Sequence, residues 1–178
     1  MSIRQRRSIR LRDYDYTRQG VYFVTICTYR RECSLGKIHR GGVELSRYGA
    51  VVQEEWLQTG QARPSVALDA FIIMPNHLHG ILWLRAVDQQ APGRVARPKV
   101  TGGRGQLESP GRGSLSAVVR GFKAASTRRI NRLRHGSRCP FWQRGFFERI
   151  VRGEAELTRI RAYIQGNPQR WRDDPTLP

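Results

Sequence analysis

The sequence predicts an α+β fold of the ferredoxin-like type, with an antiparallel sheet and helices packed on one face. Three observations support this prediction. Segments rich in β-branched and aromatic residues alternate with helical ones, in the order strand, helix, strand, strand, helix, strand, helix. Serine precedes two of the predicted helices, where its side chain can cap the first turn. The length, 178 residues, suits a single domain with its own core.

The first third of the chain is expected to contain a strand, a small hairpin and a helix. Residues Val21–Tyr29 are rich in β-branched and aromatic side chains, which predicts a strand. Residues Lys37–Leu45 are interrupted by Gly41-Gly42 and predict a hairpin. Ser46 is placed to cap a helix that we expect to end near Gln58.

The most apolar stretch of the chain, Phe71–Trp83, is broken by a Pro-Asn-His sequence at 75–77. It therefore falls short of the ~18–20 continuous apolar residues that a bilayer span needs. Two buried strands, Val66–Met74 and His77–Trp83, joined by a tight turn, account for it better. We expect no association with a membrane.

The second half begins with a change in composition. Residues 85–113 are rich in Gly, Pro and basic residues and have no periodicity, which predicts a loop insertion. Ser114 is placed to cap a helix with an apolar stripe that continues to about Leu133. A strand is expected at Phe146–Arg152, followed by a last helix over 154–166 that stops before a proline.

Basic residues dominate the charge of the chain. Lys and Arg number 32 against 14 Asp and Glu, which gives a formal net charge of +18. This excess indicates a polyanionic partner, and nucleic acid is a better candidate than a membrane surface. Residues 1–12 are expected to form a basic arm that contacts phosphate, with a merely solvated tail as the alternative. The candidate DNA-binding residues of the arm and of the 114–133 helix are Arg4, Arg6, Arg7, Arg10, Arg12, Arg120, Lys123 and Arg128.

Cysteine usage and the N-terminus indicate the compartment. The three cysteines, Cys27, Cys33 and Cys139, form no CxxC motif and no even framework. We therefore expect buried thiols in a reducing cytosol, with neither disulfides nor a structural zinc site. The basic N-terminus lacks the apolar segment of a signal peptide, so a cytoplasmic, nucleoid-associated protein is expected.

His77 and His79 are the first candidate functional residues. Alternate residues of a strand share one face, so both imidazoles are expected on the same side, ~7 Å apart. Such a pair is able to share one metal ion or one phosphate. The alternative is two polar residues near the end of a strand. A histidine-triad hydrolase or a dinuclear hydrolase site would need a third His or an acid at position 81, which is Ile81.

The last helix contributes a tyrosine and an amide. At about 100° per residue, Ile160 and Ile164 fall on the core-facing stripe, while Tyr163 and Asn167 lie together on its flank. By the same count Gln165 projects roughly 160° away from Tyr163. Tyr163 is either an amphipathic filler at the edge of the core or a nucleophile, and Asn167 is either a helix C-cap or a metal ligand.

These segments together resemble a known family. The sequence Met74-Pro-Asn-His77-Leu-His79-Gly80 resembles the His-hydrophobic-His motif of the HUH-type single-tyrosine transposases. The sequence Tyr163-Ile-Gln-Gly-Asn167-Pro168 is similar to the end of their catalytic-tyrosine helix. Residues 7–16, 24–28 and 141–147 are similar to the REP-associated tyrosine transposase branch, so the resemblance covers nearly the whole chain. After residue 147 the chain reads Glu148-Arg149, where relatives often have an acid and a histidine.

The resemblance implies a single-strand DNA endonuclease and strand transferase that depends on Mg²⁺ or Mn²⁺. His77 and His79 would be metal ligands, Asn167 a third ligand, and Tyr163 the nucleophile that forms a 5′-phosphotyrosine. The implied partner is single-stranded or hairpin DNA of the repetitive extragenic palindrome type, bound by a monomer or a homodimer. The alternative function is a domesticated protein that binds hairpin DNA or RNA without cutting it.

Overall fold

The computed structural model describes residues 19–85, 114–135 and 139–173. The basic arm at 1–12 and all but the first residue of the 85–113 insertion lie outside these ranges. The elements are β1 (Gly20–Cys27), β2 (Gly36–His39), β3 (Gly42–Leu45), α1 (Arg47–Gln61), β4 (Val66–Met74), β5 (His77–Leu84), α2 (Leu115–Leu133), β6 (Phe147–Val151) and α3 (Glu154–Gln165), with 3₁₀ turns η1 (Tyr29–Arg31) and η2 (Pro168–Asp173). Within the described ranges, no helix is both long enough and apolar enough to span a bilayer.

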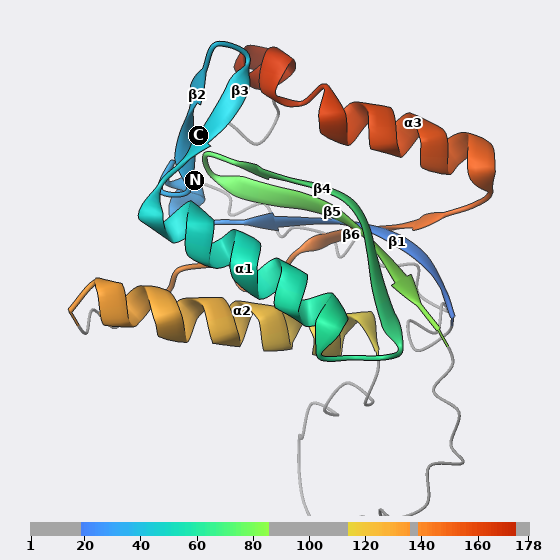
Figure 1. Cartoon of the computed structure of the whole chain (residues 1–178), viewed down its shortest axis with the longest axis horizontal. Coiled ribbons are helices and arrows are strands. Elements are labelled where there is room, and N and C mark those ends of the chain that lie inside the picture. Colours follow the sequence, from blue (N-terminus) through green and yellow to red (C-terminus); the bar gives the residue numbers. More distant parts are fainter. Residues whose placement is uncertain (1–18, 86–113, 136–138, 174–178) are drawn as a thin grey trace, which may run out of the picture.

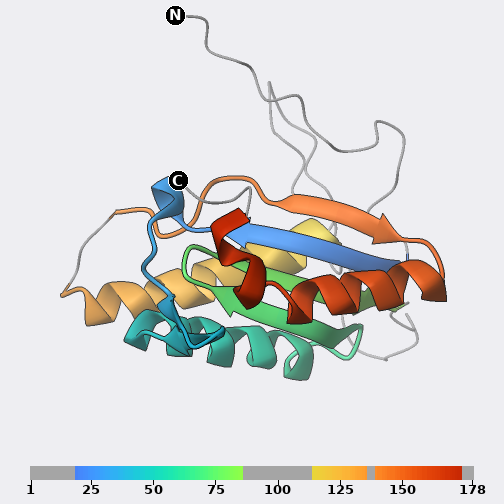
Figure 2. The ribbon, with the colours of Figure 1, turned by 90° about the horizontal axis from the view of Figure 1, so that it is seen from above.

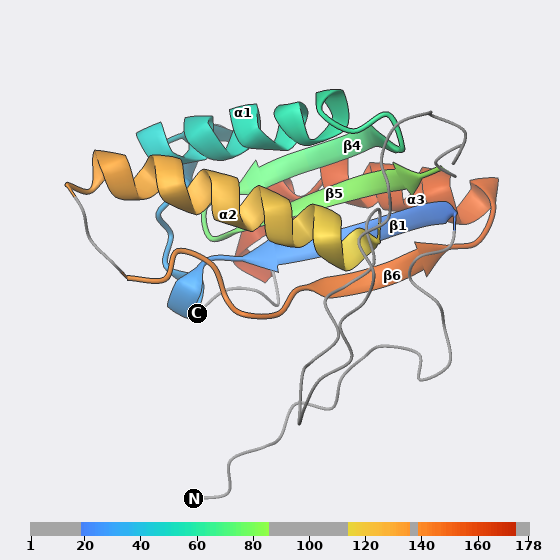
Figure 3. The same ribbon diagram turned by 90° about the horizontal axis from the view of Figure 1, so that it is seen from below.

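The main sheet has four strands in the order β4-β5-β1-β6, and each neighbouring pair is antiparallel. With α1 between β1 and β4 and α2 between β5 and β6, this is the ferredoxin-like arrangement that the element order predicted. The hairpin β2–β3 is a separate two-stranded sheet. Figures 1 and 3 show α1 and α2 side by side across the four strands.

The two faces of the main sheet are covered by different helices. Tyr22, Val24 and Ile26 of β1 pack in one buried cluster with α1 and α2, whereas Phe23 packs in a second cluster with α3. Figure 1 shows α3 across the sheet from the other two helices. The α+β class and the antiparallel sheet are confirmed, but the expectation that all helices pack on one face is wrong for α3. Strands β1 and β5 are apolar on both sides, so both faces of the sheet have to be covered.

The predicted caps and ends agree closely with the structure. The hydroxyl of Ser46 accepts hydrogen bonds from the backbone N–H groups of Tyr48 and Gly49, and that of Ser114 accepts one from Ala117. The first strand ends at Cys27, two residues earlier than expected, because Tyr29–Arg31 turn away from the sheet.

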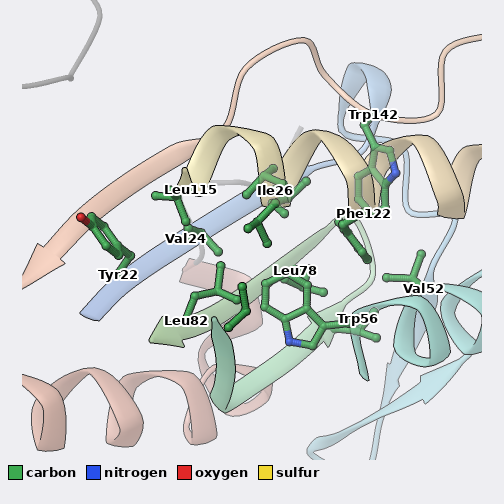
Figure 4. Close-up of a cluster of buried hydrophobic side chains, with 14 of the residues drawn as sticks. Tyr22, Val24, Ile26, Val52, Trp56, Leu78, Leu82, Leu115, Phe122 and Trp142 are labelled. Carbon is green, nitrogen blue, oxygen red and sulfur yellow. The ribbon is translucent and has the colours of Figure 1, made fainter. Parts of the chain in front are cut away.

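The larger buried cluster contains a close contact between a helix and the central sheet. The indole of Trp56, on α1, is fully buried and packs on β5 at Gly80, beside Leu78 and Leu82 (Figure 4). A Cβ atom at position 80 would lie 2.4 Å from Cζ2 of Trp56. A side chain at position 80 would therefore collide with Trp56, so packing requires a glycine there. Position 80 faces α1, on the side of β5 opposite to His77 and His79.

Gly80→Ala tests this packing contact. Neither the strand nor the indole has room to move, so we expect a loss of about 1–3 kcal/mol in the free energy of unfolding, measured by urea denaturation. Gly42→Ala is the matched control, because its added Cβ would meet only the carbonyl oxygen of His39 at 3.8 Å. The control should change stability by less than about 0.5 kcal/mol. Equal losses in both variants would show that Trp56 does not restrict position 80.

Candidate active site

His77 and His79 stand at the start of β5, on the face that α3 covers. The pairing of β1 with β5 places His77 opposite Cys27 and His79 opposite Thr25. Both imidazoles are buried, with exposed fractions of 0% and 3%. Their ring centroids are 4.3 Å apart, closer than the ~7 Å between alternate strand positions, so the rings lean toward each other. The shared face that the sequence predicted is present.

Hydrogen bonds fix the orientation of both imidazole rings. Nδ1 of His77 donates to Oδ1 of Asn76 at 2.7 Å, and Nδ1 of His79 lies 2.8 Å from the Thr25 hydroxyl. Burial lowers the pKa of His79 well below its ordinary value, and the neighbouring His77 lowers it further. His79 is therefore neutral near pH 7, which is the form in which imidazole binds metal ions.

Tyr163 of α3 completes an aromatic group around His79. Its hydroxyl lies 3.4 Å from Nε2 of His79, and the two ring centroids are 5.3 Å apart. The tyrosine ring also contacts Phe23 edge-on, with centroids 6.1 Å apart. Tyr163 belongs to the edge of the buried α3 cluster, as an amphipathic filler would, and it also presents its phenol to the histidine pair.

The amides near the end of α3 differ in their surroundings. Gln165 is exposed and lines a cavity together with Asp69 and Ile72 of β4. Asn167 lies just beyond the helix, is 3% exposed, and its Oδ1 has no hydrogen-bond partner among the described residues. The turn that follows it brings the Trp171 ring against His77, with centroids 6.2 Å apart. Tyr163, before Asn167 in the chain, and Trp171, after it, therefore both contact the histidine pair.

An ion pair that the sequence analysis missed fixes α3 against the sheet. Asp69 lies in an irregularity of β4 between Leu68 and Phe71, and its carboxylate accepts from Nε of Arg161 at 2.9 Å and from Nη2 at 2.7 Å. The indole N–H of Trp83 donates to the same carboxylate at 3.0 Å. Arg161 holds the pKa of Asp69 well below its ordinary range. The only sign in the sequence was a single acid within an apolar strand.

The predicted DNA-binding residues of α2 lie far from this site. Arg120 and Arg128 are exposed, but α2 covers the opposite face of the sheet (Figure 1). Lys123 donates to the carbonyl oxygens of Gln143 at 2.9 Å and Gly145 at 2.7 Å, and burial lowers its pKa to about 8. It therefore braces a loop. The arm residues Arg4, Arg6, Arg7, Arg10 and Arg12 fall outside the described residues.

Glu148 and Arg149, where the chain departs from the family pattern, lie on opposite faces of β6. Glu148 pairs with Val24 in the register of β1 and β6 and is buried, so it faces the α1–α2 side. Arg149 forms an ion pair with Glu156 at the start of α3, 2.6 Å away.

The fold is that of a tyrosine transposase. It aligns with a structure of the REP-associated tyrosine transposase bound to a REP hairpin, with a TM-score of 0.59 and 19% identity, over 93% of this chain and 74% of that chain. No protein-family model matches the chain. The predicted resemblance is thereby confirmed at the level of the fold.

Sequence similarity places the chain in a family with a bacterial protein. The chain is 36% identical, over 173 residues, to an uncharacterized protein of Haemophilus influenzae, covering 97% of this chain and 93% of that protein. The chain belongs to the same family as that Haemophilus protein.

Asp69→Asn tests the ion pair that holds α3. A carboxyl with a lowered pKa stabilises the fold fully above its unfolded pKa of about 3.9, and loses that contribution as the pH falls toward the native pKa. We therefore expect the variant to melt below the wild-type chain near pH 7, with the difference shrinking below about pH 4. Glu44→Gln removes an exposed pair with Lys37 and should have almost no effect. A melting difference that stays constant into the acid range would contradict this account.

Proposed function

We propose that the protein is a metal-dependent endonuclease and strand transferase that cuts and rejoins single-stranded or hairpin DNA through a 5′-phosphotyrosine. One observation carries this proposal: the Tyr163 hydroxyl lies 3.4 Å from a buried, neutral histidine whose ring leans on a second one. The transposase fold and the net charge of +18 support DNA as the substrate. The REP hairpin bound to the structural neighbour supports hairpin DNA in particular.

The donor atoms suit a divalent metal ion. His77 uses Nδ1 to donate to Asn76, which leaves Nε2 as its ligand atom, and the uncharged His79 is equally able to coordinate. The Oδ1 of Asn167 is a buried oxygen to which none of the described residues donates a hydrogen bond, and an ion would satisfy it. Mg²⁺ or Mn²⁺ is the proposed cofactor. Among the described residues, His, Cys, Asp and Glu alone form no group of three that would hold a metal.

The chemistry assigned to the protein begins at Tyr163. Its phenol oxygen attacks the scissile phosphorus, the new P–O bond forms, and the bond to the 3′ oxygen breaks with its electron pair on that oxygen. When bound, the metal ion would stabilise the charge on the phosphate and on the leaving oxygen. An ordinary phenol titrates near pH 10, so its proton has to be accepted or its phenolate stabilised close by. Attack by a 3′ hydroxyl on the phosphotyrosine then reverses the step and joins the strands.

Tyr163→Phe tests the nucleophile. The substitution removes one hydroxyl and keeps the ring packing on Phe23, so stability and affinity for a labelled hairpin oligonucleotide should stay within about twofold of wild type. The covalent protein–DNA adduct, seen on denaturing gels with Mn²⁺, should disappear. Tyr48→Phe, on the opposite side of the sheet, is the control and should keep the adduct. A wild-type chain that binds the hairpin and forms no adduct would instead be a non-catalytic binding protein.

Asn167→Ala tests the third ligand. Its Oδ1 makes no hydrogen bond in the described structure, so its loss should change the melting temperature of the metal-free protein very little. The Mn²⁺ concentration for half-maximal cleavage should rise at least about tenfold. Gln165→Ala, two residues away and exposed, should change neither quantity. A large loss of stability with an unchanged metal requirement would make Asn167 a capping residue only.

A further inference from the structure

A cavity of about 350 Å³ opens at the end of β1, where the chain leaves the sheet. Its lining residues are Tyr29, Arg30, Pro140, Trp142, Gln143 and Arg144. The lining includes two guanidinium groups and no carboxylate. Tyr29 is 37% exposed and is one of few large apolar side chains among the described residues that face solvent to this degree. An exposed aromatic ring beside two arginines suits a ligand that has a planar ring next to a negatively charged group.

The end of β1 lies between the cavity and the histidine pair and connects the two. The backbone N–H of Gln143 donates to the carbonyl of Cys27 at 3.0 Å, and Cys27 is the strand partner of His77. Gln143 and His77 lie on either side of Cys27, each about one strand spacing of 4.8 Å away. The Gln143 backbone is therefore about 10 Å from that of His77. Figure 2 shows the loop before β6 beside the turn that follows β1. The cavity and the candidate active site therefore share one end of the sheet.

The walls of the cavity are preformed. Arg30 and Arg31 adopt φ values of 54° and 58°, a left-handed conformation that is strained for arginine. The turn is held by a bond from the Tyr29 N–H to the Phe141 carbonyl, 2.8 Å, and by the bridge between Thr28 and Trp142. Across the loop, the ammonium of Lys123 is bound by carbonyls of residues 143–145.

Within the cavity the aromatic and cationic groups are arranged together. The guanidinium carbon of Arg30 lies 5.3 Å from the centroid of the Tyr29 ring, and Arg144 lines the same space. Aromatic faces stack on nucleic acid bases without regard to sequence, and arginine binds phosphate with a planar fork.

We propose that this cavity is a nucleotide subsite, in which one unpaired base stacks on Tyr29 while Arg30 and Arg144 bind the adjoining phosphate. The proposal rests on the proposed function, because the nucleotide it holds belongs to the strand that enters the Tyr163 site. The strained turn and the Lys123 brace keep the subsite open before DNA binds, which lowers the ordering cost of binding. The subsite sets where the strand lies relative to the two histidines.

The test measures binding without cleavage, in the full chain with Tyr163→Phe. The probe is a fluorescent DNA hairpin with a single-stranded thymidine flank, in which each flank base is removed in turn to leave an abasic site. Removal of the base at one flank position should lower the affinity for the hairpin roughly 5- to 100-fold. Tyr29→Ala should lose as much, and should then be insensitive to the abasic site at that position. Tyr29→Phe should bind normally, because it keeps the aromatic face.

Two controls separate the subsite from general effects. Leu57→Ala removes an exposed apolar side chain of α1 and should leave affinity unchanged. Arg144→Gln should reduce the slope of log K against log salt by about one, whereas the exposed Arg159→Gln of α3 should not. Additive effects of Tyr29→Ala and every abasic site would overturn the subsite, even if wild-type protein forms the adduct. Coupling without any adduct in wild-type protein would keep the subsite and overturn the proposed catalysis.

Discussion

The antiparallel pairing of β1 with β5 is the constraint on which the rest of the structure depends. Because side chains alternate, this register sends His77 and His79 to one face and Gly80 to the other. The glycine admits the indole of Trp56 on the α1 side, while the histidines meet Tyr163 on the α3 side. A slip of one residue would drive two imidazoles into the main core. The large apolar cluster under α1 and α2 therefore stabilises the register that the small site above it requires.

The position of α3 depends on fewer contacts, and they are polar as well as apolar. Leu157 and Ile164 bury one stripe of the helix, which sets its rotation about its own axis, but a stripe alone does not fix where the helix lies along the sheet. The bidentate pair between Asp69 and Arg161 supplies that second anchor, on the β4 side, and Tyr163 then points toward β1 and β5. Asp69 lies at the irregularity of β4, between Leu68 of the α1–α2 cluster and Ala70 of the α3 cluster. A polar side chain of an edge strand thereby helps to hold the helix that carries the candidate nucleophile.

Local sequence determines most of this architecture, and long-range contacts determine the remainder. Alternation placed His77 and His79 on one face, and the two serines marked the helix starts, because both signals act within a few residues. The covering of the second face by α3 was not predictable, since periodicity shows which side chains are apolar and not which sheet face they meet. The hydrogen bonds from Lys123 to the carbonyls of the loop at 143–145 join residues some twenty positions apart in the chain, so no local sequence pattern predicts them. The sequence therefore showed Lys123 only as one of several basic residues of a helix, and its role in DNA binding stays a prediction.

The distribution of positive charge follows from the same layering. The exposed arginines of α2 lie on the face of the sheet opposite to α3 and Tyr163, so a DNA strand bound at Tyr163 as proposed would not need to contact them. The end of β1 is different, because Cys27 pairs with His77 on one side and binds the Gln143 backbone on the other. Any displacement of that strand end would move the histidine and the arginine-lined cavity together. The two are coupled by one backbone position, so DNA bound in the proposed subsite would be held in a fixed relation to the imidazoles.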